Sequence, residues 1–362
     1  MLKTSAFKHE KILWTRARQR FCFGLLFVMM GTSLFIFYTS NLQASWLPSH
    51  STTNSEPSPS DFTMTTSPDS IISPDPPVSG YHVAYPEKYF FTLDEPNRCQ
   101  KENSFLVLMT PVAPHNKEAR DIIRNTWGKE TTVLGQRVSR YFLMGLSEEA
   151  DGTELLQKQI LQESEKHHDI LQSNFLDTYK NLTIKTMVMF EWLLSHCPNT
   201  SYAMKVDSDI FLNVHNLVDM LLTAPRTLYM TGLVVRGAAV LRDPSSKWYL
   251  PYSVFPESTY PPYALGLGYV FSLDLPQRIL EASAHVKAIY TEDVYVGLCL
   301  RHLRIPLTNP RHGRLFRLRA PRSARNCYWT SVIATILENS KQLLHVWKQY
   351  QIQSKGRCVH NQ

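Results

Sequence analysis

The chain has 362 residues, of which 43% are hydrophobic and 19% are charged, and its formal net charge is +7. This composition is too apolar for a chain that is disordered throughout, and the length suffices for one large or two medium domains. The first 20 residues hold six lysines and arginines against one glutamate, which gives +5, and the segment that follows them largely excludes a cytosolic nucleic-acid-binding protein.

Residues 21–38 form an uncharged, largely apolar segment directly after this basic N-terminus. As a helix, the segment is just long enough to cross a bilayer core of about 30 Å. No lysine or arginine follows before residue 81, so the N-terminus is expected in the cytosol. A cleaved signal peptide is the alternative, but no clear small-residue cleavage site follows. We therefore expect a cytosolic tail over 1–20 and the signal-anchor of a single-pass type II membrane protein over 21–38.

The next segment has the composition of an extended stalk. Residues 39–80 contain 11 serines, six threonines and seven prolines, which cannot bury enough apolar surface to offset chain entropy. We expect a stem over 39–100 and one lumenal catalytic domain over 101–362. An anchor, a stalk and a globular domain are typical of Golgi enzymes and of cell-surface proteins.

Sequons and cysteines also suit the secretory pathway. Asn181 and Asn199 each begin a glycosylation sequon. Five cysteines lie beyond the anchor, and an odd count in an oxidising compartment leaves at least one thiol unpaired or bonded between chains. Cys299 lies in an apolar run and is the predicted buried free thiol.

From about residue 102 the chain alternates between strand-like and helix-like segments. Strands are expected over 105–109, 141–144 and 202–206, and helices over 117–127, 148–167 and 178–196, with Asn116 capping the first helix. Such alternation predicts an α/β fold with a parallel sheet covered by helices. Neither a GxGxxG motif nor a Walker loop is present, so any nucleotide must bind by another route.

Two carboxylates, Asp207 and Asp209, follow the strand over 202–206, with Lys205 at its end and Ser208 between them. Ligands of open α/β sheets bind at the carboxyl ends of strands. Hard oxygen ligands suit Mg²⁺ or Mn²⁺, which take further positions from substrate phosphates. The pattern predicts a metal that bridges the protein and a diphosphate, although a lone Asp-x-Asp is usually a polar turn.

A second pair of acidic residues, Glu292 and Asp293, follows Thr291, which is placed to cap a helix. Acidic residues are favoured at helix N-termini by the helix dipole, and this is the simpler interpretation. A carboxylate there could instead act as a general base toward a hydroxyl.

Residues 260–271 combine aromatics, prolines and glycines, which indicates a rigid loop with close backbone approach, followed by a strand. Tyr263 and the nearby Trp248 are candidates for stacking on an acceptor sugar, or equally for core packing. Gly268 and Glu292 are further, weaker candidates for acceptor contact.

With these residues in place, the chain resembles the β-1,3-galactosyltransferase family from about residue 105 to 300. Residues 120–128, Arg-Asp-Ile-Ile-Arg-Asn-Thr-Trp-Gly, are similar to its R-x-x-I-R-x-T-W-G segment. Residues 175–186, Phe-Leu-Asp-Thr-Tyr-Lys-Asn-Leu-Thr-Ile-Lys-Thr, are similar to its F-x-D-x-Y-x-N-L-T-x-K-T segment. The Asp-Ser-Asp turn, the 260–271 loop and the Glu-Asp-Val helix start follow in the family's order.

The resemblance implies a GT-A-type fold, a UDP-sugar donor, Mn²⁺, glycoprotein or glycolipid acceptors, a Golgi location and inversion at the anomeric carbon. Matched residue by residue, it implies roles for the following groups. Asp209, with Asp207, would engage the metal and the diphosphate; Arg120, Arg124, Lys205 and Ser208 would hold the nucleotide or order the site; and Asp293 would be the general base.

Asp-Ser-Asp and Glu-Asp-Val resemble the galactose-transferring members, which favours UDP-galactose and transfer to GlcNAc or GalNAc. A β-1,3-N-acetylglucosaminyltransferase and a catalytically silent glycoprotein-binding homologue are the alternatives. The resemblance departs at residues 264–268 and at Ile336, where family members usually carry a metal-binding histidine. The sequence leaves open the acceptor glycan, the disulfide pairing and whether the chain forms a homo-oligomer.

Overall fold

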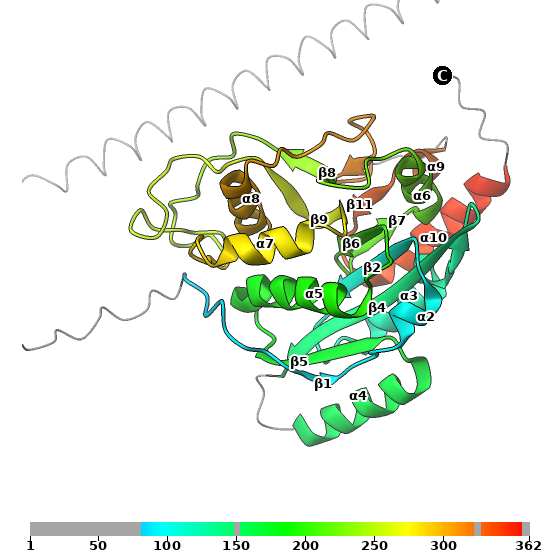
Figure 1. Ribbon diagram of the computed structural model, residues 1–362. Coiled ribbons are helices and arrows are strands. Elements are labelled where there is room, and N and C mark those ends of the chain that lie inside the picture. Colours follow the sequence, from blue (N-terminus) through cyan, green and yellow to red (C-terminus); the bar gives the residue numbers. More distant parts are fainter. Residues whose placement is uncertain (1–80, 148–152, 322–326, 357–362) are drawn as a thin grey trace, which may run out of the picture. The chain divides into compact units, whose positions relative to one another are not determined.

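The computed structural model describes residues 81–147, 153–321 and 327–356 (Figure 1). The predicted cytosolic tail, the anchor over 21–38 and the stem as far as residue 80 lie outside the described residues. Within the described ranges, no helix combines the length and the apolar character that crossing a membrane requires.

The centre of the domain is a sheet whose four middle strands are parallel, in the order β5–β4–β2–β6. These strands are β2 (Leu106–Pro111), β4 (Gln136–Leu146), β5 (Ile170–Leu176) and β6 (Tyr202–Val206). The parallel sheet predicted from the alternating pattern is therefore confirmed in its central part.

Antiparallel strands extend this sheet at both edges. β1 (Phe91–Leu93) pairs with β5, and β9 (Tyr263–Ser272) lies between β6 and β8 (Met230–Val235). The short β3 (Thr132–Val133) pairs with β4. Because β9 pairs along β6, the carboxyl end of β6 faces the middle of β9, where Val206 lies opposite Gly268.

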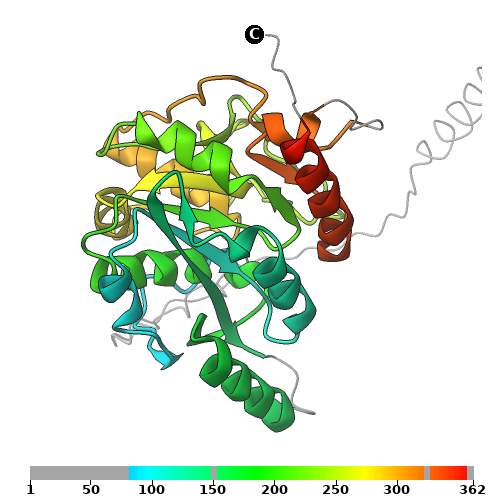
Figure 2. The ribbon, with the colours of Figure 1, turned by 90° about the vertical axis from the view of Figure 1, so that its right-hand side faces the viewer.

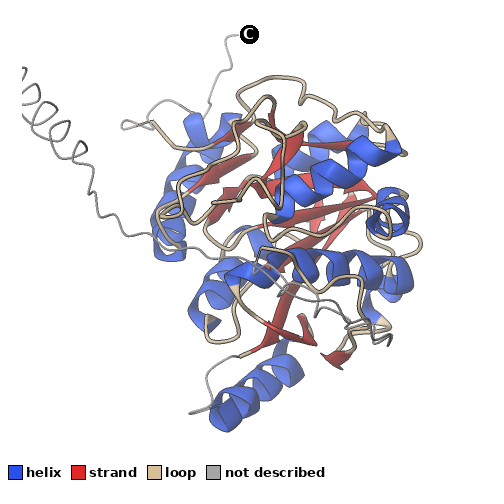
Figure 3. Cartoon of the chain, turned by 90° about the vertical axis from the view of Figure 1, so that its left-hand side faces the viewer, coloured by secondary structure: helices blue, strands red, loops and turns tan. Residues whose placement is uncertain are grey.

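Helices cover both faces of the sheet, and Figure 3 shows the red strands lying between blue helices. Alternate residues of β2 enter two cores: Val107 and Met109 pack with α5, α7 and α8, whereas Leu106 and Leu108 pack with α3, α6 and α10. The helices are α2 (Arg98–Glu102), α3 (Lys117–Asn125), α4 (Thr153–His167), α5 (Leu182–His196), α6 (Val214–Leu222), α7 (Leu275–Ser283), α8 (Glu292–Leu303), α9 (Tyr328–Ser331) and α10 (Ser340–Lys355), with 3-10 turns η2 (Trp127–Lys129) and η3 (Tyr179–Asn181).

A second, three-stranded sheet lies beside the first. It has the order β10–β11–β7 and consists of β7 (Ile210–Leu212), β10 (Phe316–Arg317) and β11 (Ala334–Ile336). Figure 2 shows the C-terminal helix α10, in red, along this side of the domain. This small sheet brings residues near 336 to the chain just after the Asp-Ser-Asp turn.

Most predicted elements have the observed type. The strand over 202–206 and the cap at Asn116, whose side chain accepts from the amide of Ala119, are confirmed. The first and third predicted helices each divide into a 3-10 turn and an α-helix. The helix predicted over 148–167 is described from Thr153 onward. The loop predicted at 260–271 is wrong in extent, because strand β9 already begins at Tyr263.

One disulfide joins Cys99 at the start of α2 to Cys197 after α5. Cys327 is also disulfide-bonded, and Cys299 on α8 is a buried free thiol. The prediction that Cys299 is unpaired is therefore confirmed.

Candidate active site

The Asp-Ser-Asp turn connects two buried strands, β6 and β7. Asp207 and Asp209 are both partly exposed, whereas the strand residues on either side of the turn are buried. The amide of Asp207 donates to the carbonyl of Leu267 on β9, and the carbonyl of Asp209 accepts from the amide of Leu337. Both sides of the turn that carries Asp207 and Asp209 are thus held by backbone contacts.

Lys205 joins this turn to the start of α8. Its buried ammonium donates to the carbonyl of Gly266 (2.7 Å) and lies 2.8 Å from Asp207 Oδ1 and 3.4 Å from Glu292 Oε2. Burial alone would lower the pKa of Lys205, but the charges of Asp207 and Glu292 outweigh it and raise that pKa. Lys205 is therefore charged and fully engaged with protein groups, which suits a role in ordering the site.

Asp293 lies in the first turn of α8 beside this network. Its Oδ2 accepts from the amide of Gly266 and its Oδ1 from the amide of Val294, both at 2.9 Å. Burial and then the charge of Glu292 raise the pKa of Asp293 to about 6. A carboxylate with such a pKa is mostly ionised at neutral pH yet more basic than an ordinary aspartate, as a general base requires.

The glycines of the 260–271 segment permit close approach between β9, β6 and α8. A Cβ at Gly266 would lie 3.4 Å from the carboxylate of Asp293, and one at Gly268 would lie 2.9 Å from the end of the Met204 side chain. Close backbone approach was predicted for this segment and is confirmed. Gly268 is buried, so its predicted contact with an acceptor stays a prediction and its observed role is packing.

The predicted aromatic contacts differ in exposure. Tyr263 is buried in the core at 9% exposure, whereas Trp248 is 48% exposed. Tyr179, the tyrosine of the family-like segment 175–186, is 46% exposed, although no contact with a sugar was predicted for it. Burial and then the charge of Asp293 raise the pKa of Tyr179, which places its hydroxyl within electrostatic reach of the candidate base. Trp248 and Tyr179 are thus both exposed, whereas the stacking of Tyr263 on a sugar would require it to leave the core.

Arg120 and Arg124 belong to a different network. Arg120 is buried, forms two bonds with Glu163 and donates to the carbonyls of Ala113 and Pro114. Arg124 pairs with Asp169 and Glu163. The structure does not bring either arginine into contact with Lys205. Arg120 has committed four of its five donor hydrogens to Glu163 and to the loop after β2, and its role toward the nucleotide or the site stays a prediction.

The second family-like segment, 175–186, also orders strand ends. Buried Lys185 pairs with Asp177 at 2.8 Å and donates to the carbonyl of Val112. Asp177 accepts in turn from the amide of Gly145. These contacts tie together the carboxyl ends of β2, β4 and β5, which is the edge where an α/β sheet binds its ligand.

Asp207 and Asp209 fit a hard divalent cation. Burial and then the charge of Asp207 raise the pKa of Asp209, and a shared cation would relieve this repulsion. In the part of the chain that the structure describes, no group of three His, Cys, Asp or Glu side chains is arranged to hold a metal. Mg²⁺ and Mn²⁺ sites with one or two carboxylates are completed by water and substrate phosphates, so this donor set suits a metal bound together with a diphosphate.

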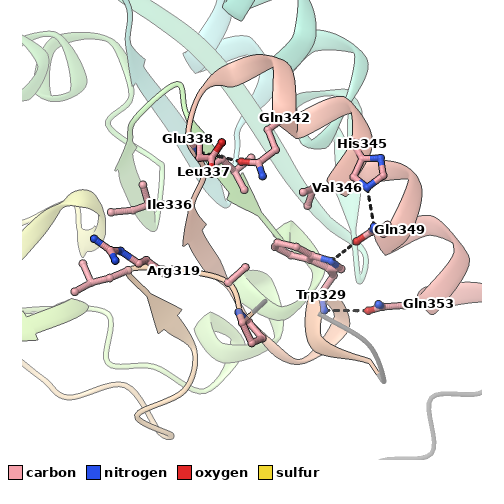
Figure 4. Close-up of a pocket in the computed structure, with 13 residues that line it drawn as sticks. Arg319, Trp329, Ile336, Leu337, Glu338, Gln342, His345, Val346, Gln349 and Gln353 are labelled. Carbon is pink, nitrogen blue, oxygen red and sulfur yellow. Dashed lines mark hydrogen bonds between the residues drawn. The ribbon is translucent and has the colours of Figure 1, made fainter. Parts of the chain in front are cut away.

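Ile336 lies next to this turn, because β11 pairs with β7 and Ile336 is opposite Ile210. The position that the resemblance assigns to a histidine is therefore adjacent to Asp209 and apolar. Ile336 also lines a cavity of about 910 Å³ between β11 and α10. Figure 4 shows polar side chains of α10 around this cavity, and neither Asp209 nor Asp293 lines it.

The two sequons lie in different surroundings. Asn181 donates to the carbonyl of Leu176, and the buried hydroxyl of Thr183 donates to the carbonyl of Ile289. Asn199 is exposed in the turn after α5. Glycosylation of both stays a prediction, and the geometry favours Asn199.

We expect Asn199→Gln to abolish the mobility shift that peptide-N-glycosidase F causes in protein from eukaryotic cells. Asn181→Gln should leave the shift unchanged, because a glycan on Asn181 would displace its bond to Leu176. A shift that persists in Asn199→Gln and disappears in Asn181→Gln would reverse this assignment.

Comparison with known proteins gives consistent matches. The family model described as Galactosyltransferase matches residues 118–311. Over 280 residues, the chain is 39% identical to beta-1,3-galactosyltransferase 2 of Homo sapiens and of Pongo abelii. This match covers 76% of this chain and 66% of each relative. It is 37% identical over 279 residues to beta-1,3-galactosyltransferase 1 of Mus musculus, covering 75% of this chain and 82% of the relative. The match thus spans slightly less than two thirds of the type 2 relatives.

Proposed function

Because this chain belongs to the β-1,3-galactosyltransferase family, we propose that it transfers galactose from UDP-galactose in β-1,3 linkage to a terminal GlcNAc or GalNAc. The acceptor would be a glycoprotein or glycolipid glycan. The observation that carries the proposal is the network in which Lys205 joins Asp207 to Glu292, with Asp293 held next to it by Gly266. It brings a candidate base and a candidate diphosphate site together at one strand end.

Asp293 supplies the basic half of the reaction. It would take the proton of the acceptor hydroxyl as the hydroxyl oxygen bonds to the anomeric carbon of the donor. The amides of Gly266 and Val294 hold the carboxylate in place, so it need not reorganise during proton transfer. The proton ends on Asp293, and attack on the face opposite to UDP inverts the anomeric carbon without a covalent enzyme intermediate.

Asp209, with Asp207, would hold Mn²⁺ together with the donor diphosphate, which is the other half of the reaction. A bound divalent metal would neutralise charge that develops on UDP as the glycosidic bond breaks. Asp207 is already paired with Lys205, so Asp209 is the carboxylate with more freedom to bind the metal. The predicted nucleotide contact of Ser208 belongs to the same turn.

We also propose that the chain is a single-pass type II protein of the Golgi membrane with its catalytic domain in the lumen. The basic tail, the apolar segment over 21–38 and the Ser/Thr/Pro-rich segment support this location, as does the disulfide between Cys99 and Cys197.

The proposal is tested by following UDP release from the full chain, expressed in eukaryotic cells, with UDP-galactose or UDP-GlcNAc and with Mn²⁺ or EDTA. Acceptors ending in β-GlcNAc, GalNAc and β-Gal are compared. We expect acceptor-stimulated, Mn²⁺-dependent turnover of UDP-galactose. Turnover with UDP-GlcNAc alone would make the chain an N-acetylglucosaminyltransferase. A folded protein without turnover would be a silent homologue, and Ile336 would be the first residue to examine.

The pH dependence of transfer follows from Asp293. Because its pKa is raised to about 6 and the base must be ionised, kcat/KM should fall about tenfold per pH unit below that value and level off above it. The measurement is kcat/KM between pH 4.5 and 8 at saturating Mn²⁺, with UDP binding followed in parallel. A profile that is flat through pH 6 while UDP binding is constant would remove Asp293 as the base.

A further inference from the structure

Lys247 is a cation beside the candidate site that the proposed mechanism does not use. It lies on the long loop between β8 and β9, next to Trp248, and its side chain is exposed. Its Nζ lies 4.5 Å from the centre of the Trp248 ring and 5.7 Å from that of Tyr179. Cation–π contacts orient an ammonium over an aromatic face and leave its charge available to an anion.

The backbone at Lys247 is fixed relative to the start of α8. The hydroxyl of Tyr290 donates to the carbonyls of Lys247 and Tyr249, each at 2.9 Å. Tyr290 precedes Asp293 by three residues, and its ring centre lies 6.3 Å from that of Tyr179. The loop, the two exposed rings and the helix that carries the candidate base therefore form one connected group.

A series of contacts leads from the start of α8 to the Asp-Ser-Asp turn, because Asp293 accepts from the amide of Gly266 and the carbonyl of Gly266 accepts from Lys205. The ammonium of Lys205 is already bonded to Asp207 and Gly266 and is close to Glu292. Lys247 forms no salt bridge with the described residues.

The electrostatic balance of the site calls for such a cation. Four carboxylates, Asp207, Asp209, Glu292 and Asp293, lie near the buried cation Lys205, and the other buried lysine of the described residues, Lys185, is paired with Asp177. An approaching diphosphate adds further negative charge, and its repulsion by these carboxylates is substantial at the low effective dielectric of a partly buried site. A bound metal would offset part of this negative charge, and an exposed lysine held beside the site can offset more of it.

We propose that Lys247 binds the diphosphate of the nucleotide-sugar donor, with Trp248 and Tyr179 holding its side chain in position. When the bond between the sugar and UDP breaks, the electron pair passes to the β-phosphate oxygen, and Lys247 stabilises that charge. The inference rests on the proposed transferase function, and it adds Lys247 to the groups that stabilise UDP as the leaving group.

The test compares UDP with uridine, which lacks the diphosphate, by calorimetry on the full chain with Mn²⁺. Lys247→Met keeps the approximate length of the side chain and removes its charge, whereas Lys247→Arg keeps the charge. The matched control is Lys348→Met, at an exposed position of α10. We expect Lys247→Met to weaken the binding of UDP about 10- to 100-fold, the range of a charge-assisted contact. The affinity for uridine should not change. Lys247→Arg should retain most of the affinity, and Lys348→Met all of it.

Each contrary outcome is distinct. Equal losses for UDP and uridine would mean that Lys247 only packs the loop, and unchanged UDP affinity would overturn the inference. Unchanged UDP affinity with a raised KM for sialylated or sulfated acceptors would mean that Lys247 binds the acceptor. If the unsubstituted chain bound no UDP and showed no turnover, the proposed function itself would fail.

Discussion

Asp293→Asn should reduce galactose transfer about 1,000-fold, since removal of a positioned general base typically costs between 100- and 10,000-fold. The asparagine has nearly the same size but cannot accept the proton of the acceptor hydroxyl. UDP binding should stay largely intact, because Asp293 bonds to the amides of Gly266 and Val294 and not to the Asp-Ser-Asp turn. The measurements are kcat for transfer and the UDP affinity in the presence of Mn²⁺.

Asp219→Asn, on an exposed position of α6, is the matched control and should leave both quantities unchanged. Loss of UDP binding together with transfer in Asp293→Asn would show that Asp293 is a structural residue of the β9–α8 contact. A lowered unfolding temperature would point the same way.

Asp209→Ala should abolish the part of UDP binding that depends on Mn²⁺. Asp207 is engaged by Lys205, whereas Asp209 forms no salt bridge with the described residues, and burial and then the charge of Asp207 raise its pKa. We expect UDP affinity with Mn²⁺ to fall to the value that the unsubstituted chain shows with EDTA, about 100-fold weaker if the metal contact accounts for about 3 kcal/mol. Calorimetric titration of UDP, with and without Mn²⁺, measures this directly.

Asp219→Ala is the corresponding control. Since Asp209 is partly exposed and its carbonyl, not its side chain, holds Leu337, the substitution should leave thermal unfolding unchanged. UDP affinity that responds to Mn²⁺ in Asp209→Ala as in the unsubstituted chain would remove Asp209 from the metal site.

Local signals were enough to predict where the main carboxylates lie. A buried apolar strand that ends in Asp-Ser-Asp places these carboxylates at a sheet edge whatever the rest of the fold. Likewise, Thr291 marked the start of α8, and Thr291 is its N-cap residue, although its side chain makes no capping bond. Cys299 was predicted to be buried because it lies in an apolar run, and it is.

The contacts between distant segments could not be predicted from the sequence. Lys205 and Glu292 are 87 residues apart, and only the pairing of β6 with β9 and the packing of α8 bring them together. The arginines of the 120–128 segment were expected to hold the nucleotide or to order the site, and no local signal indicated that Glu163 of α4 and Asp169 before β5 bind them. The sequence around Lys247 did not mark it as a site residue. Its ammonium is oriented by the rings of Trp248, its neighbour, and of Tyr179, which lies 68 positions earlier in the chain.

The disulfide between Cys99 and Cys197 closes a covalent loop with a sequence separation of 98 residues. That loop contains β2, α3, β4, α4, β5 and α5, and therefore three of the four parallel strands, all except β6. A cross-link over so long a segment restricts the unfolded chain far more than it changes the folded one. The half of the sheet with β2, β4 and β5 thus refolds within a covalent loop of limited freedom, whereas the segment with Asp209 and Asp293 follows that loop in the sequence and is not enclosed by it.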